Sequence, residues 1–389
     1  MKKIIFCTDS LIMGGQEKIS IDYLKLLSEI NEFEIFLLLN EDNGADNYFI
    51  KDIPKGIKYE FVIDKNIIEK INLYRKLKSK NIIYKLFYNY YLKRRRFNYR
   101  KNIKKILENQ KYDYILDFSS QLPYWVCNEK VYSWSHLSLS KIKMRKLREA
   151  RKKVNSIGKL VVLTDDMLRE AKKIFFKEKQ EKFVRIYNFF DIEEIQKLSL
   201  DKSQLNNQEK SLIEEDYFFA CCRIDKQKDI DTLIESYKIL KEKYKIKEKL
   251  YIAGIGDQKE RLENLLKNYN LEKDIIFLGI QKNPYVWMKN SKFFIHSSHY
   301  EGFGLVLVEA LISNGLVVAS DCPTGPREIL ENGKSGILFP VGDKEKIVEI
   351  VLKVLENKEL VESYKKEAKR RIEDFSKDKI KKEIKKLLK

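Results

Sequence analysis

Short apolar runs alternate with helical patterns along almost the whole chain, and this alternation restricts the fold more than any other feature. Each run has the length of a buried strand, and the patterns between them have helical periodicity. The runs are Lys3–Cys7, Glu34–Leu39, Tyr114–Phe118, Val131–Trp134, Leu160–Thr164, Tyr217–Cys222, Lys249–Ala253, Asp274–Leu278, Phe293–His296 and Leu316–Ala319. Strands that alternate with helices form parallel sheets, so the sequence predicts an α/β fold.

The length of 389 residues suits two domains of this kind. The stretch Asp191–Glu215 is polar and weakly patterned, and we expect the junction near its start. We predict one Rossmann-like domain over residues 1–190 and a second over 191–375, with the terminal helix 376–389 returning to the first. Ligands of parallel sheets bind beyond the carboxyl ends of the strands, so a cleft between the two domains is expected. Such a fold alone does not define a function.

Composition excludes several classes of protein. Hydrophobic residues make up 43% of the chain, which is enough for folded cores. No stretch approaches the roughly 18 consecutive apolar residues of a membrane-spanning helix. The first fifteen residues fit a strand better than a signal peptide, because Thr8, Asp9 and Ser10 interrupt the apolar run. The five cysteines lack metal-ligand spacing, and free thiols suit a reducing cytosol.

The formal charge of +19 is concentrated in residues 64–105, where fifteen Lys and Arg accompany two acids. Aromatic residues are interleaved with them: Tyr74, Tyr84, Phe87, Tyr88, Tyr90, Tyr91, Phe97 and Tyr99. This mixture suits an anionic membrane surface. Nucleic acid is a competing partner, but no known nucleic-acid module is present, so the membrane is favoured. The excess also agrees with a genome rich in Lys, Ile, Asn and Tyr codons, and that alternative stays open.

The densest signal lies between His296 and Leu330, around the sequence EGFGLVLVEAL. Its glycines precede a helix that we expect to end at Asn314-Gly315, and a glycine-rich helix start binds phosphate well. Glu301 and Glu309 stand eight residues apart, up to about 12 Å along a helix. This spacing suits two acids that hold different sugars of one extended ligand. An ordinary amphipathic helix would leave Glu309 poorly placed among apolar neighbours.

This segment resembles the signature of retaining GT-B glycosyltransferases, specifically glycosyltransferase family 4, the glycosyl transferases of group 1. The resemblance implies that Glu309 holds the ribose of a nucleotide and that Glu301 lies by the transferred sugar. It also implies that the backbone after Glu301 faces the sugar and the diphosphate, through Gly302, Phe303, Gly304 and Leu305.

Other segments of the second half resemble the family in the same order. The stretch CCRIDKQKD implies that Arg223 and Lys228 neutralise the donor diphosphate, whose leaving group gains negative charge. The segment with Gly254 resembles the family's strand-and-glycine turn, and the resemblance implies that the backbone at Ile280 and Gln281 contacts the base. The pair Asp229/Asp231 opens a helix and is not read as a metal site. The resemblance implies no metal and no cofactor.

The first half matches less closely. Gly14, Gly15 and Glu17 resemble the family's glycine loop over the phosphates and the acceptor, although an ordinary turn would also explain them. His136 follows a strand at a position where relatives carry a histidine that lines the reaction centre, and a core or surface histidine is the alternative. Residues 41–110 match no part of the family, so we expect the acceptor determinants there.

These observations predict a retaining transferase that moves a hexose or N-acetylhexosamine from a nucleoside-diphosphate sugar, with UDP favoured. The expected acceptor is a lipid-linked glycan of bacterial capsule, lipopolysaccharide, surface polysaccharide or glycoprotein assembly, reached from the cytoplasmic face of the membrane. The predicted catalytic residues are His136, Glu301, Arg223 and Lys228. A GT-B epimerase or hydrolase and a basic nucleic-acid-binding protein remain as alternatives.

Overall fold

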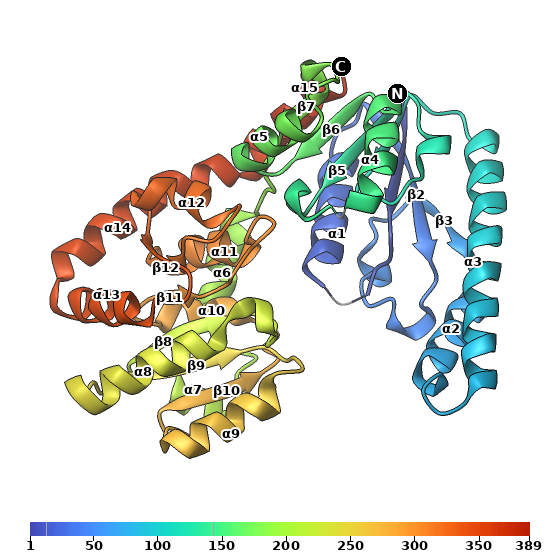
Figure 1. Ribbon diagram of the computed structural model, residues 1–389. Coiled ribbons are helices and arrows are strands. Elements are labelled where there is room, and N and C mark those ends of the chain that lie inside the picture. Colours follow the sequence, from blue (N-terminus) through green and yellow to red (C-terminus); the bar gives the residue numbers. More distant parts are fainter. Residues whose placement is uncertain (13, 143) are drawn as a thin grey trace. The chain divides into compact units, whose positions relative to one another are not determined.

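The computed structural model describes residues 1–12, 14–142 and 144–389 and separates into two α/β units (Figure 1). The first unit contains residues 1–163, 167–186 and 384–389, and the second contains residues 164–166 and 187–383. Each unit is built on one sheet whose paired strands are all parallel. The predicted α/β class is therefore confirmed.

The first sheet has the order β3-β2-β1-β4-β5-β6-β7. Its strands are β1 Lys2–Thr8, β2 Phe33–Glu41, β3 Lys58–Ile63, β4 Tyr114–Asp117, β5 Val131–Ser135, β6 Lys159–Val162 and β7 Phe183–Arg185. The helices of this part are α1 Gly15–Ser28, α2 Lys65–Leu77, α3 Ile82–Asn109, α4 Met144–Ser156 and α5 Asp165–Ile174. The long helix α3 packs on α2 and lies beside the outer strand β3 (Figure 1). This hairpin of α2 and α3 carries most of the basic stretch 64–105.

The second sheet has the order β10-β9-β8-β11-β12-β13. Its strands are β8 Tyr217–Cys221, β9 Lys249–Ala253, β10 Ile275–Gly279, β11 Phe294–His296, β12 Val317–Ser320 and β13 Ile337–Phe339. The helices are α6 Ile192–Leu200, α7 Asn207–Leu212, α8 Ile230–Tyr244, α9 Lys259–Tyr269, α10 Pro284–Asn290, α11 Leu305–Ser313, α12 Pro326–Ile329, α13 Lys344–Glu356, α14 Lys358–Arg371 and α15 Lys377–Leu387. Central strand residues such as Phe218, Ile252 and Val318 are buried against α8 and α13. Burial of each such side chain contributes about 1.5–3 kcal/mol.

The end of the chain lies in the first unit, whereas residues 376–383 group with the second unit. Residues 384–389 group with the first unit, and the Lys2 ammonium donates to the Leu388 carbonyl oxygen at 2.6 Å. Lys385 forms an ion pair with Glu32 at 3.0 Å. A short 3-10 turn over Ile372–Phe375 separates α14 from α15.

The stretch Asp191–Glu215 is more ordered than its polar sequence indicated, because it contains α6 and α7. Asp191 caps α6 by accepting from the Glu194 amide, and Asn206 and Glu209 form a capping box on α7. Helix α6 packs against α10 and α11. In the part of the chain that the structure describes, no helix is long and apolar enough to cross a membrane.

Candidate functional site

The loops after β8, β9 and β10 form one continuous ledge at the carboxyl edge of the second sheet. The Cys222 amide donates to the Ala253 carbonyl at 3.0 Å, and the Gly254 amide donates to the Gly279 carbonyl at 2.7 Å. Gly254 has φ +132°, and a Cβ there would lie 1.9 Å from the Cys222 carbonyl oxygen. Only glycine therefore fits at this position, where the loops after β8 and β9 approach each other closely.

A buried charged cluster lies beside this ledge and is centred on Glu301. The Lys228 ammonium lies 2.6 Å from Glu301 Oε1, and His296 Nε2 lies 2.7 Å from the same oxygen. The Glu301 side chain is only 10% exposed and that of Lys228 only 12%. Burial opposes ionisation, but the His296 hydrogen bond and the charges of His296 and Lys228 outweigh it and hold the pKa of Glu301 well below its ordinary value. Glu301 is thus a carboxylate at neutral pH.

The loop that carries Glu301 is fastened to its neighbours on both sides. On one side, Ser297 Oγ donates to the Lys228 carbonyl at 2.7 Å. On the other side, the Glu301 amide donates to the Pro323 carbonyl at 3.3 Å, and the Thr324 hydroxyl donates to the Glu301 carbonyl. The carboxylate is therefore positioned before any ligand arrives.

Helix α11 begins at Leu305, after the turn of residues 302–304 that follows Glu301. Gly304 is its N-cap with φ +94°, and Phe303 is buried with its ring centroid 6.0 Å from the ring of Tyr187. A Cβ on Gly325 would lie 2.1 Å from the Phe303 carbonyl oxygen, so the turn packs closely against the loop after β12. The first amides of a helix have no acceptor within it, and its positive end favours an anion. Gly302 precedes Phe303 in this turn, and Leu305 is the first residue of the helix.

Glu309 lies further along α11, and the Tyr285 hydroxyl donates to its Oε1 at 3.0 Å. Tyr285 is buried at the start of α10, so it fixes the rotamer of the carboxylate. The sequence did not indicate Tyr285 or His296 as site residues. His296 lies inside the recognised segment, but its contact with Glu301 becomes visible only in the folded chain.

Arg223 does not join the Glu301 cluster. Its side chain is 73% exposed and forms an ion pair with Asp225 at 3.2 Å. Arg223 and Lys228 still share the loop between β8 and α8, so both cations lie at the same sheet edge. An exposed guanidinium has the reach to approach a bound phosphate.

Ile280 and Gln281 follow β10, as expected for a turn that reads a base through its backbone. Ile280 is 54% exposed. The Gln281 side chain is engaged within the protein, because it accepts from Trp287 Nε1 at 2.9 Å and donates to Glu209 at 3.0 Å. The Gln281 side chain is therefore occupied within the protein, whereas the Ile280 side chain is exposed.

The predicted residues of the first unit lie at the carboxyl edge of the first sheet. Gly14 is the N-cap of α1, Gly15 opens that helix, and Glu17 lies in its first turn. Burial raises the pKa of Glu17, and the charge of Asp9 adds to the effect. His136 follows β5.

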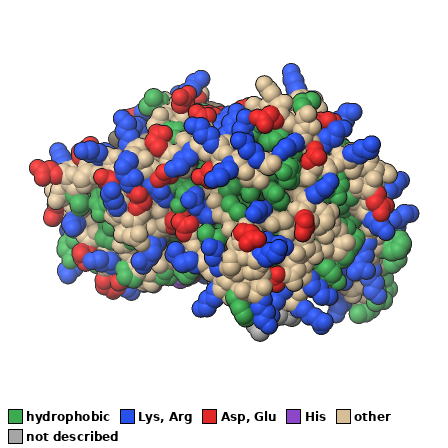
Figure 2. Space-filling view, turned by 90° about the horizontal axis from the view of Figure 1, so that it is seen from above, with side chains coloured by type: hydrophobic (Ala, Val, Ile, Leu, Met, Phe, Trp, Pro, Cys, Tyr) green, Lys and Arg blue, Asp and Glu red, His purple; other side chains and the backbone are tan. Residues whose placement is uncertain are grey.

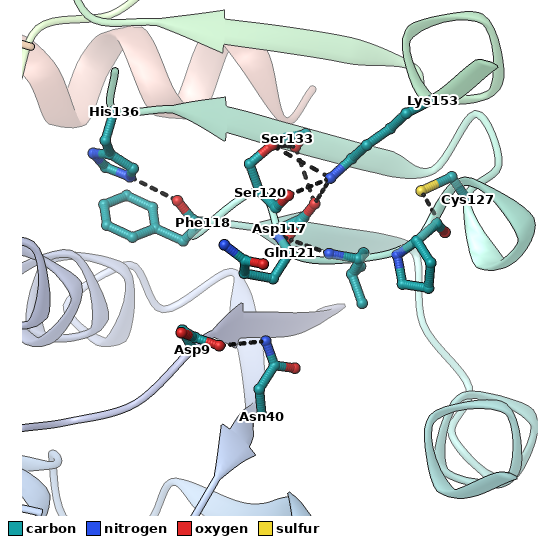
Figure 3. A network of polar contacts seen from close by, with 12 residues as sticks. Asp9, Asn40, Asp117, Phe118, Ser120, Gln121, Cys127, Ser133, His136 and Lys153 are labelled. Atoms are coloured by element: carbon teal, nitrogen blue, oxygen red, sulfur yellow. Dashed lines mark hydrogen bonds and ion pairs between the residues drawn. The ribbon is translucent and has the colours of Figure 1, made fainter. Parts of the chain in front are cut away.

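His136 is held in one tautomer (Figure 3). Its Nε2 lies 2.6 Å from the Phe118 carbonyl oxygen, which can only accept, so Nε2 carries the proton. Burial lowers the pKa of His136 to about 4, although this hydrogen bond and the charge of Asp117 act in the opposite direction. At pH 7 the ring is neutral, and its Nδ1 is an acceptor.

The carbonyl that holds His136 belongs to a loop fixed by a buried ion pair (Figure 3). Asp117 Oδ2 accepts from the Lys153 ammonium at 2.6 Å and from the Ser133 hydroxyl at 3.0 Å. Oδ1 accepts from the backbone amides of Gln121 and Leu122 at 3.0 and 3.3 Å. Asp117 thus ties the loop after β4 to β5 and α4. No local sequence pattern indicated this pair.

Two groups of predicted residues are therefore each brought together at a sheet edge. In the second unit, Lys228 contacts Glu301, and the glycine-rich turn and α11 follow directly. In the first unit, Gly14, Gly15, Glu17 and His136 share the carboxyl edge of their sheet. Among residues 1–12, 14–142 and 144–389, no three His, Cys, Asp or Glu side chains gather as metal ligands would.

Known proteins resemble this chain in sequence and in fold. The family model for glycosyl transferases group 1 matches residues 202–371, which include β8 to α14. An uncharacterised glycosyltransferase of Methanocaldococcus jannaschii is 32% identical over 294 residues, which cover 68% of this chain and 70% of that relative. A Campylobacter jejuni enzyme is 33% identical over 195 residues, half of each chain. It is named N-acetylgalactosamine-N,N'-diacetylbacillosaminyl-diphospho-undecaprenol 4-alpha-N-acetylgalactosaminyltransferase.

Solved structures establish the fold over the full length. The Anabaena protein HepE, crystallised with UDP and glucose, has a TM-score of 0.71 at 19% identity and covers 100% of this chain and 99% of its own. The predicted GT-B class, with two parallel-sheet Rossmann-like domains, is confirmed by this match and by the two sheets described above. The identity and coverage of the archaeal relative, together with the family match, show that this chain belongs to the glycosyl transferases of group 1.

Proposed function

We propose that this chain is a retaining transferase of glycosyltransferase family 4 that moves a hexose or N-acetylhexosamine from a nucleoside-diphosphate sugar to a lipid-linked glycan. The observation that carries the proposal is the ionised Glu301, fixed by Lys228 and His296 next to the start of α11. We favour UDP as the nucleotide, since HepE binds UDP. The name of the Campylobacter enzyme supports an acceptor on undecaprenyl diphosphate in assembly of a surface glycan or glycoprotein.

In this proposal the second unit holds the donor. The diphosphate lies at the start of α11, against the backbone of Gly302, Phe303, Gly304 and Leu305. One N–H of the Lys228 ammonium is engaged by Glu301, and two further donors remain for phosphate oxygens. Arg223 approaches from the exposed side. Fixed positive groups of this kind stabilise the charge that grows on the leaving diphosphate. The ledge at Gly254 and the backbone at Ile280 and Gln281 bind the nucleoside, and Glu309 holds its ribose.

The proposal gives the charged Glu301 and the neutral His136 different roles toward the transferred sugar. Glu301 orients its hydroxyls and offsets the positive charge that develops at the anomeric carbon. His136 accepts from a hydroxyl through its neutral Nδ1, while Gly14, Gly15 and Glu17 lie on the acceptor side. The acceptor hydroxyl attacks the face from which the diphosphate leaves, and the departing phosphate takes the proton. Lys228, Arg223 and the helix supply the positive charge, so we propose that no metal is required.

Retention of the anomeric configuration of the sugar is tested on the reaction product. We expect the new glycosidic bond to have the anomeric configuration of the donor sugar, because attack and departure share one face. Proton NMR of the purified product measures this through the anomeric coupling constant. An inverted anomeric centre would contradict the proposed mechanism and leave the family assignment intact.

We further propose that α3 docks on the anionic inner face of the cell membrane. Figure 2 shows Lys and Arg side chains spread over the face that it displays, so basic charge alone does not single out a docking element. Exposed apolar side chains do so, because seven of them lie along α3: Ile82, Ile83, Tyr84, Leu86, Phe87, Tyr90 and Phe97. Phe97 is 68% exposed and Ile82 66%. Apolar and basic groups on one helix suit the interface of an anionic bilayer.

Vesicle flotation tests this docking. We expect the wild-type protein to float with phosphatidylglycerol vesicles and much less with phosphatidylcholine vesicles. Serine at Ile82, Leu86 and Phe97 together is expected to lower binding at least about tenfold, since each buried methylene contributes about 0.8 kcal/mol. The matched control places serine at three exposed apolar residues of the second unit, Leu200, Tyr244 and Val341.

Equal flotation with both lipids would show that the charge reflects composition alone. A salt-dependent shift of an oligonucleotide would instead favour the nucleic-acid alternative.

A further inference from the structure

A cavity of about 830 Å³ lies in the first unit, beyond the carboxyl ends of β1 and β2. Its volume falls in the range of roughly 300–1,000 Å³ that small-molecule sites occupy. Its lining comes from the ends of these strands, from the loop after β2, and from α2 and α3. None of Gly14, Glu17 or His136 is part of this lining, so the mechanism above leaves the cavity without a role.

The loop that forms one wall is held in place by its own hydrogen bonds. Asp42 Oδ1 accepts from the Gly44 amide and from Asn47 Nδ2, both at 2.8 Å. The Phe49 amide donates to the Leu11 carbonyl at 2.9 Å, which ties the loop to the segment after β1. A ligand would therefore meet a preformed wall and would not have to order it.

Two acids at the strand ends are also fixed. Asn40 Nδ2 donates to Asp9 Oδ1 at 3.1 Å (Figure 3), and the Tyr99 hydroxyl donates to Asn40 Oδ1 at 3.2 Å. Glu41 is held by Arg95, whose Nε lies 2.6 Å from Glu41 Oε1. Buried or half-buried carboxylates that are fixed in this way are good acceptors for the hydroxyl groups of a ligand.

The charge of the lining distinguishes between ligand classes. Three carboxylates (Asp9, Glu41 and Asp46) face two guanidinium groups (Arg75 and Arg95), which gives a net charge of −1. The Glu41 ion pair already neutralises Arg95. A phosphate or diphosphate would therefore meet a net negative site, whereas a neutral polyhydroxylated ligand would find acceptors.

The apolar and aromatic residues that line the cavity are also suited to binding a sugar. Leu92, backed by the buried Ile68 and Ile71, gives it an apolar side, which suits the C–H face of a pyranose ring or an acetamido methyl group. Tyr48 adds an aromatic ring that is 47% exposed. Ile68 and Ile71 also belong to the small core that α2 and α3 share.

We propose that this cavity binds a neutral sugar residue of the acceptor glycan and so determines acceptor specificity. The inference rests on the proposed transferase function. It assigns a ligand to residues 41–95, which lie in the part of the chain without family resemblance. The apolar side of the cavity is built on the same helices as the proposed membrane surface, so a glycan on a lipid carrier would be delivered next to it.

Saturation-transfer NMR with methyl glycosides tests the cavity directly. The probes are the methyl glycosides of glucose, galactose, mannose, N-acetylglucosamine and N-acetylgalactosamine. We expect signal transfer to at least one of them in the wild type. Ala45→Trp fills the cavity from its wall and is expected to abolish the transfer, and Tyr48→Ala is expected to reduce it at least about threefold.

Tyr59→Ala is the matched control. Tyr59 lies on β3 outside the lining, is 46% exposed, and packs on Phe61 as Tyr48 packs on Phe49. It is expected to leave the transfer unchanged. Absence of transfer to every glycoside in the wild type, or transfer that Ala45→Trp leaves undiminished, would overturn the proposal.

UDP binding to the same samples, measured by calorimetry, separates this test from that of the donor site. We expect one UDP dissociation constant for wild type, Ala45→Trp and Tyr48→Ala. Glycoside binding that Ala45→Trp abolishes in a protein without UDP affinity would support the sugar cavity and refute the donor assignment.

Discussion

Replacement of Lys228 by alanine is expected to lower kcat by about 100- to 1,000-fold, the effect of removing one fixed transition-state donor. The ammonium lies 2.6 Å from Glu301 in a site where both side chains are nearly buried. Its loss removes a cation from the leaving diphosphate and one of the two groups that keep Glu301 ionised. We expect a loss of the same order for Arg223→Ala, since Arg223 is the second cation proposed to contact the diphosphate. Because Arg223 is exposed and has no role in the core, this variant is expected to stay folded. Turnover is measured as nucleotide release under saturating donor.

Lys226→Ala is the control for both variants. Lys226 belongs to the same 3-10 turn as Lys228 and is exposed. It is expected to retain activity within about twofold. Circular dichroism and thermal melting establish that all three variants are folded. Near-normal turnover in both Lys228→Ala and Arg223→Ala would remove the assignment of these residues to the donor diphosphate.

Lys153→Met is expected to destabilise the first unit by about 3–5 kcal/mol, the cost of leaving one member of a buried ion pair unpaired. The Asp117 side chain is 1% exposed, and its Oδ2 lies 2.6 Å from the Lys153 ammonium. Methionine matches the length of the lysine stem and cannot neutralise that carboxylate. Urea unfolding measures the change. The adjacent Lys152→Met should cost less than about 1 kcal/mol, because Lys152 is exposed and lies over the Tyr124 ring.

The double variant Asp117→Asn/Lys153→Met identifies the cause. Asparagine keeps an oxygen for the Gln121 and Leu122 amides and removes the buried charge. We expect it to recover most of the stability lost in Lys153→Met, which appears as a coupling energy in the double-mutant cycle. Additive losses would show that the ion pair contributes little and that packing of the lysine stem dominates.

Much of the fold could be predicted from the sequence because the strands are short apolar runs with clear ends. Strand β9 was predicted with the bounds that the structure has, Lys249–Ala253. The turn between α14 and α15 has a tertiary cause that the sequence does not show. Arg371 is buried at the end of α14, where it pairs with Asp374 at 2.5 Å and donates to the Ile329 carbonyl at 3.1 Å. Nothing near Arg371 in the sequence shows that its side chain turns inward.

The candidate site likewise contains residues that the sequence could indicate and residues that only the folded chain brings together. Glu301, Glu309 and Lys228 lie in segments with a recognisable order, so the sequence could indicate them. Tyr285 and Asp117 act through partners 24 and 36 residues away, and only the folded chain brings these together. The cavity near Asp9 is lined by two strand ends, a loop and two helices, so no local sequence pattern predicts it.

The measurement that tests the central claim most directly is nucleotide release from a panel of UDP-, GDP- and other nucleotide sugars, with a crude lipid-linked acceptor extract. Wild type is compared with Glu309→Ala, because Glu309 is the proposed ribose ligand and its rotamer is fixed by Tyr285. We predict release from one donor in the wild type and a loss of at least about 100-fold in Glu309→Ala. Release that is equal in the two proteins would contradict the proposed donor site.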